Sequence, residues 1–323
     1  MKILHDVHTH NLFSHCCWDY SASTEAFIQK EQEIGNRVFG LSNHIWDERV
    51  KGASYWYSRQ TIALAEEAKA AIRRERDGIR CLFGVEGEFF GHQNILGMSY
   101  EGAQHFDYLL IPHSHLHMRN RVMSDFPEVL EMRAAIEAKV REACPFLADD
   151  AVKAMVNSLG EAHLMKYIPE MKTNVGEFVA KKSIENFHLL MDHPEFIKIC
   201  ATVPTSISHP FNLCGVANEL KNEYLRLIDD ETLLDCFQRA KRIGAYVEVN
   251  IGSVGECGWD LSQNELMRVF AAAKKAGCQF TFGTDSHSVN SLACIRRGDQ
   301  ICDYLGLTRS DIAPFLAEDG VED

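Results

Sequence analysis

The sequence predicts an α/β fold in which helices alternate with the strands of a parallel sheet. Along the 323 residues, short apolar runs alternate with longer segments that have the 3.6-residue period of a helix. Seven apolar runs have the length of a strand, and a polar or glycine-containing turn follows each of them. This alternation indicates a parallel barrel or a doubly wound sheet, and the length suits one barrel or two domains.

The individual elements follow from the apolar period and from end signals. The predicted strands are 2–7, 37–42, 80–85, 108–112, 197–203, 245–250 and 279–284. Helices are predicted at 23–33, 57–75, 231–243 and 263–277. The first of these helices starts at Ser23 with a glutamate in its first turn, and the last ends at Gly277.

The regular spacing breaks once, between the fourth and fifth strands. About 84 residues separate the strand that ends near Pro112 from the run that begins near Ile197, and helical patterns cover 126–143, 149–159 and 174–191. We therefore predict one domain over 1–323 with a helical insertion at about 118–196, carried on one βα loop. Such loops lie at the C-terminal face of a βα barrel, so the insertion is expected to help to roof the site.

The composition excludes several classes of protein. The 33 Lys and Arg against 46 Asp and Glu give a formal charge of −13, whereas nucleic-acid binding needs basic surface. No apolar run reaches the roughly 18 residues of a membrane span, and the first residues, interrupted by His5 and Asp6, are not typical of a signal peptide. Eleven cysteines without a CxxC pair fit free thiols. We expect a cytoplasmic protein with no membrane partner and no nucleic-acid partner.

Histidines and carboxylates follow the first and the last predicted strands. His8 and His10 lie two residues apart at the end of the first strand, as do Asp285 and His287 after the last one. In an extended segment residues i and i+2 point the same way, so each pair can reach one metal ion. The two pairs become neighbours when a barrel closes. His15 follows five residues after the first pair.

Four intermediate strand ends repeat this pattern. The residues concerned are His44, Glu86, the pair His113 and His115, and His209. Six of the seven strand ends therefore carry a metal-ligating residue type, which scattered surface histidines would not produce. The sequence predicts a metal site at the C-terminal face of the sheet.

Taken in order, these motifs resemble those of the PHP (polymerase and histidinol phosphatase) superfamily. The matching segments are Asp6-x-His8-x-His10, Asn43-His44, Gly84-x-Glu86, the region of His113, Ser208-His209 and Gly283-Thr284-Asp285-x-His287. The resemblance spans residues 1 to about 300 apart from the insertion. It implies a distorted (β/α)7 barrel whose C-terminal face holds two or three divalent metal ions, and His and carboxylate ligands suit Zn, Mn and Fe alike. The ligand sets that it implies are His8, His10, Glu86 and Asp285 for a first ion, Glu86 as a bridge with His113 and His209 for a second, and His15, His44 and His287 for a third.

The sequence departs from the family pattern at two places. Asn43 stands where the family usually has an aspartate, which removes a negative partner that could orient His44. The second departure concerns the ligand after strand four. In the family, the distance in sequence between this ligand and the aspartate that opens the strand is usually one residue longer than the distance between Asp107 and His113. His115 could serve instead, although His113 is preferred.

Such a site is strongly positive once divalent ions are bound, and phosphate is the obvious anion for it. The resemblance implies a phosphoesterase in which Glu86, Asp285 and His209 take part in catalysis and a metal-activated hydroxide attacks the phosphate. A small phosphate monoester, L-histidinol phosphate being the natural candidate, is the leading substrate. The alternatives are a phosphodiesterase or exonuclease acting on nucleotides and a non-catalytic, metal-stabilised module.

Further residues are expected to contact the substrate. Arg119 and Arg121 open the insertion and could close on its phosphate, with a solvated basic turn as the alternative. Asn250 and His115 are the other candidates. Cys16 could also be imagined as a nucleophile beside His15, but adjacency in sequence does not provide the geometry that this chemistry requires.

Overall fold

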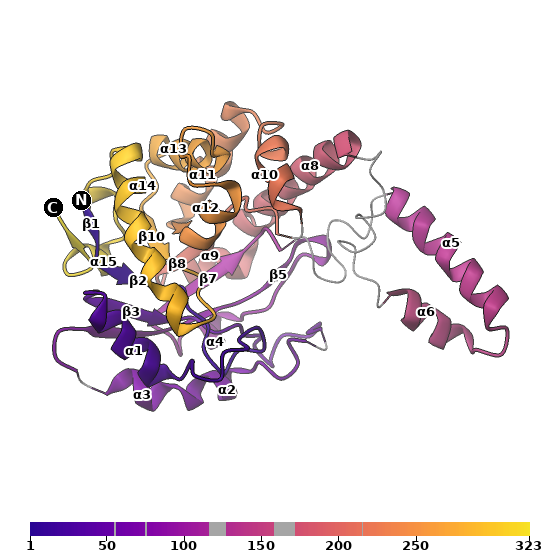
Figure 1. Cartoon of the computed structure of the whole chain (residues 1–323), viewed down its shortest axis with the longest axis horizontal. Coiled ribbons are helices and arrows are strands. Elements are labelled where there is room, and N and C mark those ends of the chain that lie inside the picture. The colour runs from indigo at the N-terminus through magenta and orange to yellow at the C-terminus, as the bar shows by residue number, and fades with distance from the viewer. Residues whose placement is uncertain (55, 75, 116–126, 158–171, 215) are drawn as a thin grey trace.

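Seven parallel strands form the centre of the molecule in the computed structural model, which describes residues 1–54, 56–74, 76–115, 127–157, 172–214 and 216–323 (Figure 1). Their order is β10-β9-β8-β7-β4-β3-β2. The strands are β2 (His5–Asp6), β3 (Val38–Leu41), β4 (Arg80–Glu86), β7 (Tyr108–Pro112), β8 (Thr205–Ser208), β9 (Tyr246–Asn250) and β10 (Phe280–Gly283).

The two edges of this sheet approach each other, so that the sheet is a nearly closed barrel. The backbone N–H of Val7 donates to the carbonyl of Phe282 at 3.1 Å, and that of Asp285 donates to the carbonyl of His8 at 2.8 Å. Of the two alternatives that the strand pattern left open, a parallel barrel and a doubly wound sheet, the structure has the barrel, which confirms the fold that the resemblance implies. Closure places the segments after β2 and β10 side by side, as the paired ligand motifs require.

The fifth predicted strand was wrong. Residues 197–203 lie in helix α9 (Pro194–Cys200) and the turn after it, and the strand is β8 at Thr205–Ser208. Phe196, Ile199 and Val203 are buried, whereas Ile197 is 40% exposed. Buried residues at i, i+3 and i+7 have the period of a helix, and Pro194 occupies its first turn, where a missing N–H costs nothing.

Aromatic packing against glycines shapes the interior of the barrel. The hydroxyl of Tyr108 lies 2.8 Å from the carbonyl oxygen of Val7 and 3.2 Å from that of Leu41. A Cβ at Gly40 would lie 2.3 Å from that hydroxyl, and a Cβ at Gly84 2.2 Å from the Tyr108 ring. Only glycine therefore leaves room for this side chain, which ties together the strands that carry the site.

Helices cover the outside of the barrel. Their N-terminal caps agree with one predicted helix start and divide another predicted helix in two. Helix α1 (Thr24–Glu33) is capped by Ser23, whose hydroxyl accepts from the N–H of Ala26. The predicted helix 57–75 is interrupted, because the Thr61 side chain caps α2 (Ile62–Glu67) and a separate α3 (Lys69–Arg73) follows. The other helices that cover the barrel are α4 (Tyr100–Ala103), α10 (Asn218–Leu225), α11 (Asp230–Ile243), α12 (Ile251–Cys257), α13 (Glu265–Lys275), α14 (Gly298–Leu305) and α15 (Pro314–Ala317).

Short elements complete the described chain. They are the antiparallel pairs β1 (Lys2–Ile3) with β11 (Val321–Glu322) and β5 (Phe89–Phe90) with β6 (Ile95–Leu96), and the 3-10 helices η1 (Gly91–Gln93), η4 (Val289–Arg297) and η5 (Arg309–Asp311). All eleven cysteines are free thiols, as expected. No helix within the described residues is both long enough and apolar enough to cross a bilayer.

The described parts of the long segment between β7 and β8 are mostly helical, and the boundaries of the insertion stay a prediction. The segment holds α5 (Pro127–Ala143), α6 (Asp149–Asn157), α8 (Lys172–Met191) and α9. Helix α8 packs against α10 and α11, whereas Figure 1 shows α5 and α6 next to each other and apart from the barrel. Residues 116–126 and 158–171, which include Arg119 and Arg121, lie outside the described residues. The expected roof over the site therefore stays a prediction.

Candidate metal centre

Most of the predicted ligands gather at the C-terminal end of the barrel. His8 and His10 follow β2, Glu86 ends β4, His209 follows β8 and Asp285 follows β10. Parallel strands end at one face of a barrel, so residues far apart in the sequence meet there. His209 and Asp285 have positive φ angles of 29° and 57°. Non-glycine residues in this region carry about 1–3 kcal/mol of strain, a feature that is concentrated at functional sites.

The first group of potential ligands consists of His8, His10 and Glu86, with Asp285 beside them. All three are buried, and the Nε2 atoms of the two histidines lie 3.0 Å apart. Each Nε2 lies 3.4 Å from Oε2 of Glu86. Oδ1 of Asp285 lies 3.2 Å from Nε2 of His10 and 3.5 Å from Nε2 of His8. Four ligand atoms thus converge on one point.

Glu86 extends from this first group toward two others. Its Oε2 lies 3.0 Å from Nδ1 of His44, and its Oε1 lies 2.9 Å from Nε2 of His209. The Ser208 hydroxyl donates to Oε1 at 3.1 Å. The two carboxylate oxygens therefore face different histidines, which is the arrangement that a bridging carboxylate needs.

The second group consists of His115, His209 and Cys214, whose ligand atoms lie within 4.8 Å of one another. The structure does not bring His113 to this group. His113 packs edge-on against Phe187 and Phe211, and its Nε2 accepts the backbone N–H of Phe211 at 3.0 Å. The preferred strand-four ligand is thus occupied in the packing around Phe211, and the alternative, His115, faces the cluster.

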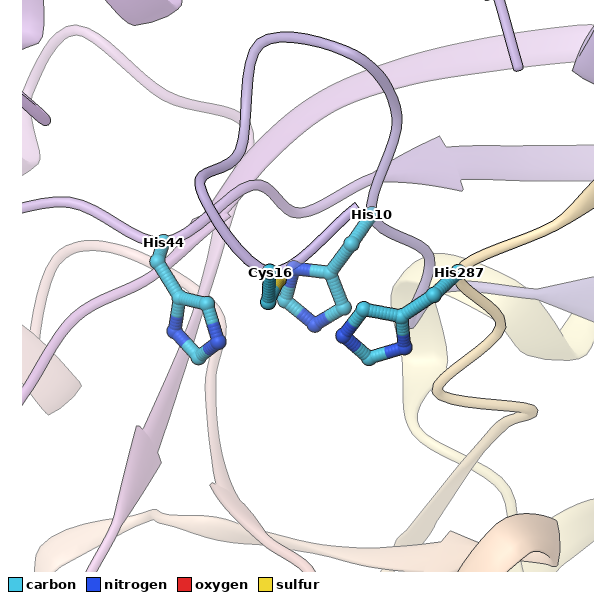
Figure 2. A group of neighbouring side chains, drawn as sticks. All are labelled: His10, Cys16, His44 and His287. Atoms are coloured by element: carbon cyan, nitrogen blue, oxygen red, sulfur yellow. The ribbon is translucent and has the colours of Figure 1, made fainter. Parts of the chain in front are cut away.

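The third group consists of His10, Cys16, His44 and His287, again within 4.8 Å (Figure 2). The rings of His44 and His287 stack on either side of His10, with centroid distances of 4.4 and 4.6 Å. His15, the expected ligand, is exposed, and its Nδ1 lies 3.1 Å from the carbonyl oxygen of Trp56. Cys16 and Cys214 were not expected as ligands, and no spacing pattern in the sequence indicates either of them.

Outer partners orient the imidazoles of His8 and His209. Nδ1 of His8 lies 2.6 Å from Oε1 of Glu248, so the proton is on Nδ1 and the lone pair of Nε2 faces the cluster. Gly283 permits this contact, because a Cβ there would lie 2.2 Å from the Cβ of His8 and 2.6 Å from Glu248. Ser114 donates its hydroxyl to the carbonyl of His209 and accepts from Nδ1 of the same residue at 2.9 Å.

The same logic applies to His287 and His115. Nδ1 of His287 lies 2.7 Å from the carbonyl oxygen of Asp285, and Nδ1 of His115 lies 2.9 Å from Oε2 of Glu88. The outer contacts of these four histidines thus direct Nε2, the atom that would bind a metal ion once it is unprotonated, toward the cluster. Glu248 and Glu88 were missed as partners from the sequence. The signal for Glu248 is its place two residues before Asn250 on β9, which puts both side chains on one face.

The ionisation of the cluster also suits cations. Burial lowers the pKa of His10 to about 4 and that of His44 well below its usual value. Burial alone would raise the pKa values of Glu86 and Asp285. Neighbouring histidines outweigh burial and hold both pKa values well below the usual range. These histidines are His44 and His8 beside Glu86, and His8 and His10 beside Asp285. Neutral imidazoles and ionised carboxylates are the states in which these residues bind metal ions.

Two histidines of the third group, His10 and His44, each have a buried Nδ1 without a hydrogen-bond partner among the described residues. Buried polar atoms almost always have a hydrogen-bond partner, so an unpartnered nitrogen among several potential metal ligands is consistent with a bound cation. The donor set as a whole fits divalent ions that accept nitrogen, oxygen and sulfur ligands.

Two further asparagines occupy structural positions beside the cluster. Asn250 caps α12 by accepting the N–H of Ser253 at 2.8 Å, and its Nδ2 lies 3.3 Å from Oε1 of Glu248. Its expected contact with substrate stays a prediction. Asn43 exchanges hydrogen bonds with Asn11, at 2.9 and 2.7 Å, and not with His44.

Comparisons with known proteins identify the fold. Neither a protein-family model nor a curated protein sequence matches the chain. Among solved structures, the chain is similar to a histidinol phosphate phosphatase from Lactococcus lactis subsp. lactis Il1403, determined with zinc, L-histidinol and phosphate. The match has a TM-score of 0.54 and 14% sequence identity and covers 94% of each chain. The chain therefore shares its fold with that phosphatase, and in this chain the fold is a nearly closed, seven-stranded α/β barrel.

Proposed function

We propose that this protein is a metal-dependent phosphatase that hydrolyses phosphate monoesters of small molecules. The observation that carries the proposal is the continuity of the three ligand groups. The first and third groups share His10, and Glu86 connects the first group to His209 of the second. Two or three divalent ions, Zn, Mn or Fe, would be held side by side by this arrangement.

The ions would supply positive charge for phosphoryl oxygens and lower the pKa of a coordinated water toward about 7. The chain's own residues position them. Glu86 contributes the negative charge between groups, and Glu248 fixes the tautomer of His8. Asp285 keeps 29% of its side chain exposed, so it is the ligand of the first group that lies at the mouth of the site, where substrate enters. His8 and Glu86, by contrast, are almost fully buried.

The substrate class is inferred from charge and from the likeness in fold. The protein carries a formal charge of −13, so a positive cavity is set in an acidic surface that repels nucleic acids. The similar phosphatase was determined with L-histidinol and phosphate, which makes L-histidinol phosphate the first compound to test. We further propose that Arg119 and Arg121 contact the substrate phosphate.

A substrate panel tests this function. The protein, loaded in turn with Zn, Mn and Fe, is assayed with L-histidinol phosphate, a generic aryl phosphate, the corresponding diester and a short oligonucleotide. Hydrolysis of the monoesters is expected. Preference for the diester or the oligonucleotide would replace the proposal by a phosphodiesterase or exonuclease. Full metal loading without any hydrolysis would indicate a non-catalytic module.

A further inference from the structure

The third ligand group contains the thiol of Cys16 where the imidazole of His15 was expected. Cys16 lies with His10, His44 and His287, and the four potential ligand atoms are within 4.8 Å of one another (Figure 2). Two ligand atoms of a tetrahedral zinc ion lie roughly 3.3–3.8 Å apart, so the four atoms, all within 4.8 Å of one another, need to close up only slightly to form a coordination sphere. We propose that Cys16, and not His15, is a metal ligand, which makes the third site a mixed thiolate and imidazole site. This inference rests on the metal-binding part of the proposed function.

Backbone and side-chain contacts direct His15 away from the cluster. Its N–H donates to Oε1 of Gln60 at 3.0 Å, and Gln60 is itself buried. Its Nδ1 lies 3.1 Å from the carbonyl oxygen of Trp56, and its ring meets the Trp56 ring edge-on. Gln60 and Trp56 thus hold both the backbone and the ring of His15 on the outer side of the loop.

The same loop directs Cys16 toward the cluster. The N–H of Cys17 donates to the carbonyl of Ser14 at 3.0 Å, which closes a tight turn around Cys16. Sγ of Cys17 donates to the carbonyl of His287 at 3.2 Å and so joins this turn to the segment after β10. The hydroxyl of Ser14 lies 3.1 Å from Sγ of Cys16. The turn is therefore held against the strand end that supplies His287.

A second observation points to a ligand at this place. His10 is buried, and its Nδ1 has no hydrogen-bond partner among the described residues. The stacked rings of His44 and His287 flank it, so three imidazoles and one thiol lie together beside the carboxylates of Glu86 and Asp285. A cation that binds Cys16 and the imidazoles resolves this arrangement.

The thiolate determines which ion the site prefers. On binding, the bond between sulfur and metal forms as the S–H bond breaks, and the proton leaves to solvent. Thiolate is a soft ligand that favours Zn, Co(II) and Fe(II), whereas carboxylate and water ligands suit Mn and Mg. The third site is therefore expected to take zinc when both zinc and manganese are supplied.

Cobalt substitution tests the ligand directly. Cobalt(II)-loaded protein should show the intense near-ultraviolet absorption of thiolate-to-cobalt charge transfer. Because Cys214 lies in the second group, the measurement compares C214S with the double variant C16S/C214S. The C214S protein should keep the band, and the double variant should lose it together with one ion per chain. The H15A variant should retain both, and C17S serves as a neighbouring-thiol control.

X-ray absorption of the zinc-loaded protein supplies a readout that needs no variant at Cys16. The C214S protein should show a sulfur shell at about 2.3 Å from zinc. A band of full intensity in the double variant, or no sulfur signal in any loaded protein, would overturn the proposal, as would loss of an ion from H15A. Neither readout depends on turnover. An inactive wild-type protein with a sulfur signal would refute the phosphatase and leave the cysteine ligand standing.

Discussion

Replacement of Glu86 by glutamine removes the charge that the ligand groups share and keeps the shape of the side chain. Glu86 is 1% exposed, with one oxygen 2.9 Å from Nε2 of His209 and the other 3.0 Å from Nδ1 of His44. A pair of unit charges 4 Å apart interacts by about 4 kcal/mol at an effective dielectric constant of ~20. A carboxylate between two divalent ions contributes at least that much, and about 4 kcal/mol corresponds to roughly a thousandfold in binding constant.

The fold should survive Glu86→Gln, because an amide can still donate to the lone pair of His209. A charge-assisted hydrogen bond of ~1.5–3 kcal/mol is exchanged for a neutral one of ~0.5–1.5 kcal/mol, so the unfolding free energy should fall by about 1–2 kcal/mol. Equilibrium dialysis with elemental analysis measures the bound ions, and turnover of an aryl phosphate measures activity. We expect at least one ion to be lost and activity to fall by orders of magnitude.

The matched control is Glu88→Gln, which changes another buried carboxylate. Oε2 of Glu88 accepts from the hydroxyl of Tyr57 at 2.7 Å and from Nδ1 of His115 at 2.9 Å, so it acts through the imidazole. Loss of such an outer partner should weaken metal binding by only about 10–100-fold. Near-normal turnover and metal content in Glu86→Gln, with a larger loss in Glu88→Gln, would refute the bridging role of Glu86.

Three further predictions follow from the cluster. Elemental analysis of protein kept from chelators should find more than one divalent ion per chain, and a value at or below one would leave only a mononuclear site. His115→Ala should lose metal, whereas His113→Ala should mainly lower the unfolding free energy by about 1–3 kcal/mol, because the N–H of Phe211 loses its acceptor; the reverse result would return the ligand to His113. Burial lowers the pKa values of His8 and His209, but nearby carboxylates raise both above the usual value, so metal must displace protons there. Apparent affinity should therefore rise with pH by about tenfold per unit for each proton released, and calorimetry in two buffers that shows no proton release would contradict this.

Much of the fold could be predicted because it depends on local period and on the rule that parallel strands end at one face. His8 and His10, two residues apart, and Asp285 were predicted as ligands in this way, and barrel closure brings their side chains together. The prediction of a strand at 197–203 was wrong because the local pattern there does not decide between strand and helix. A short apolar run fits both periods, and only its packing, with Phe196 and Ile199 buried and Ile197 exposed, makes it a helix.

The sequence by itself therefore determined which strand ends carry residue types that can bind metal ions, because side-chain alternation and strand direction are encoded in a few adjacent residues. Only the tertiary structure decided which of two neighbours in a loop faces the cluster. His15 is directed outward by Gln60, 45 residues away, and His113 is held by Phe211, 98 residues away. Cys16 and His115, and not those two histidines, lie in the groups of potential ligands. Contacts at such separations leave no periodic trace in the chain, so they become visible only after the barrel has closed.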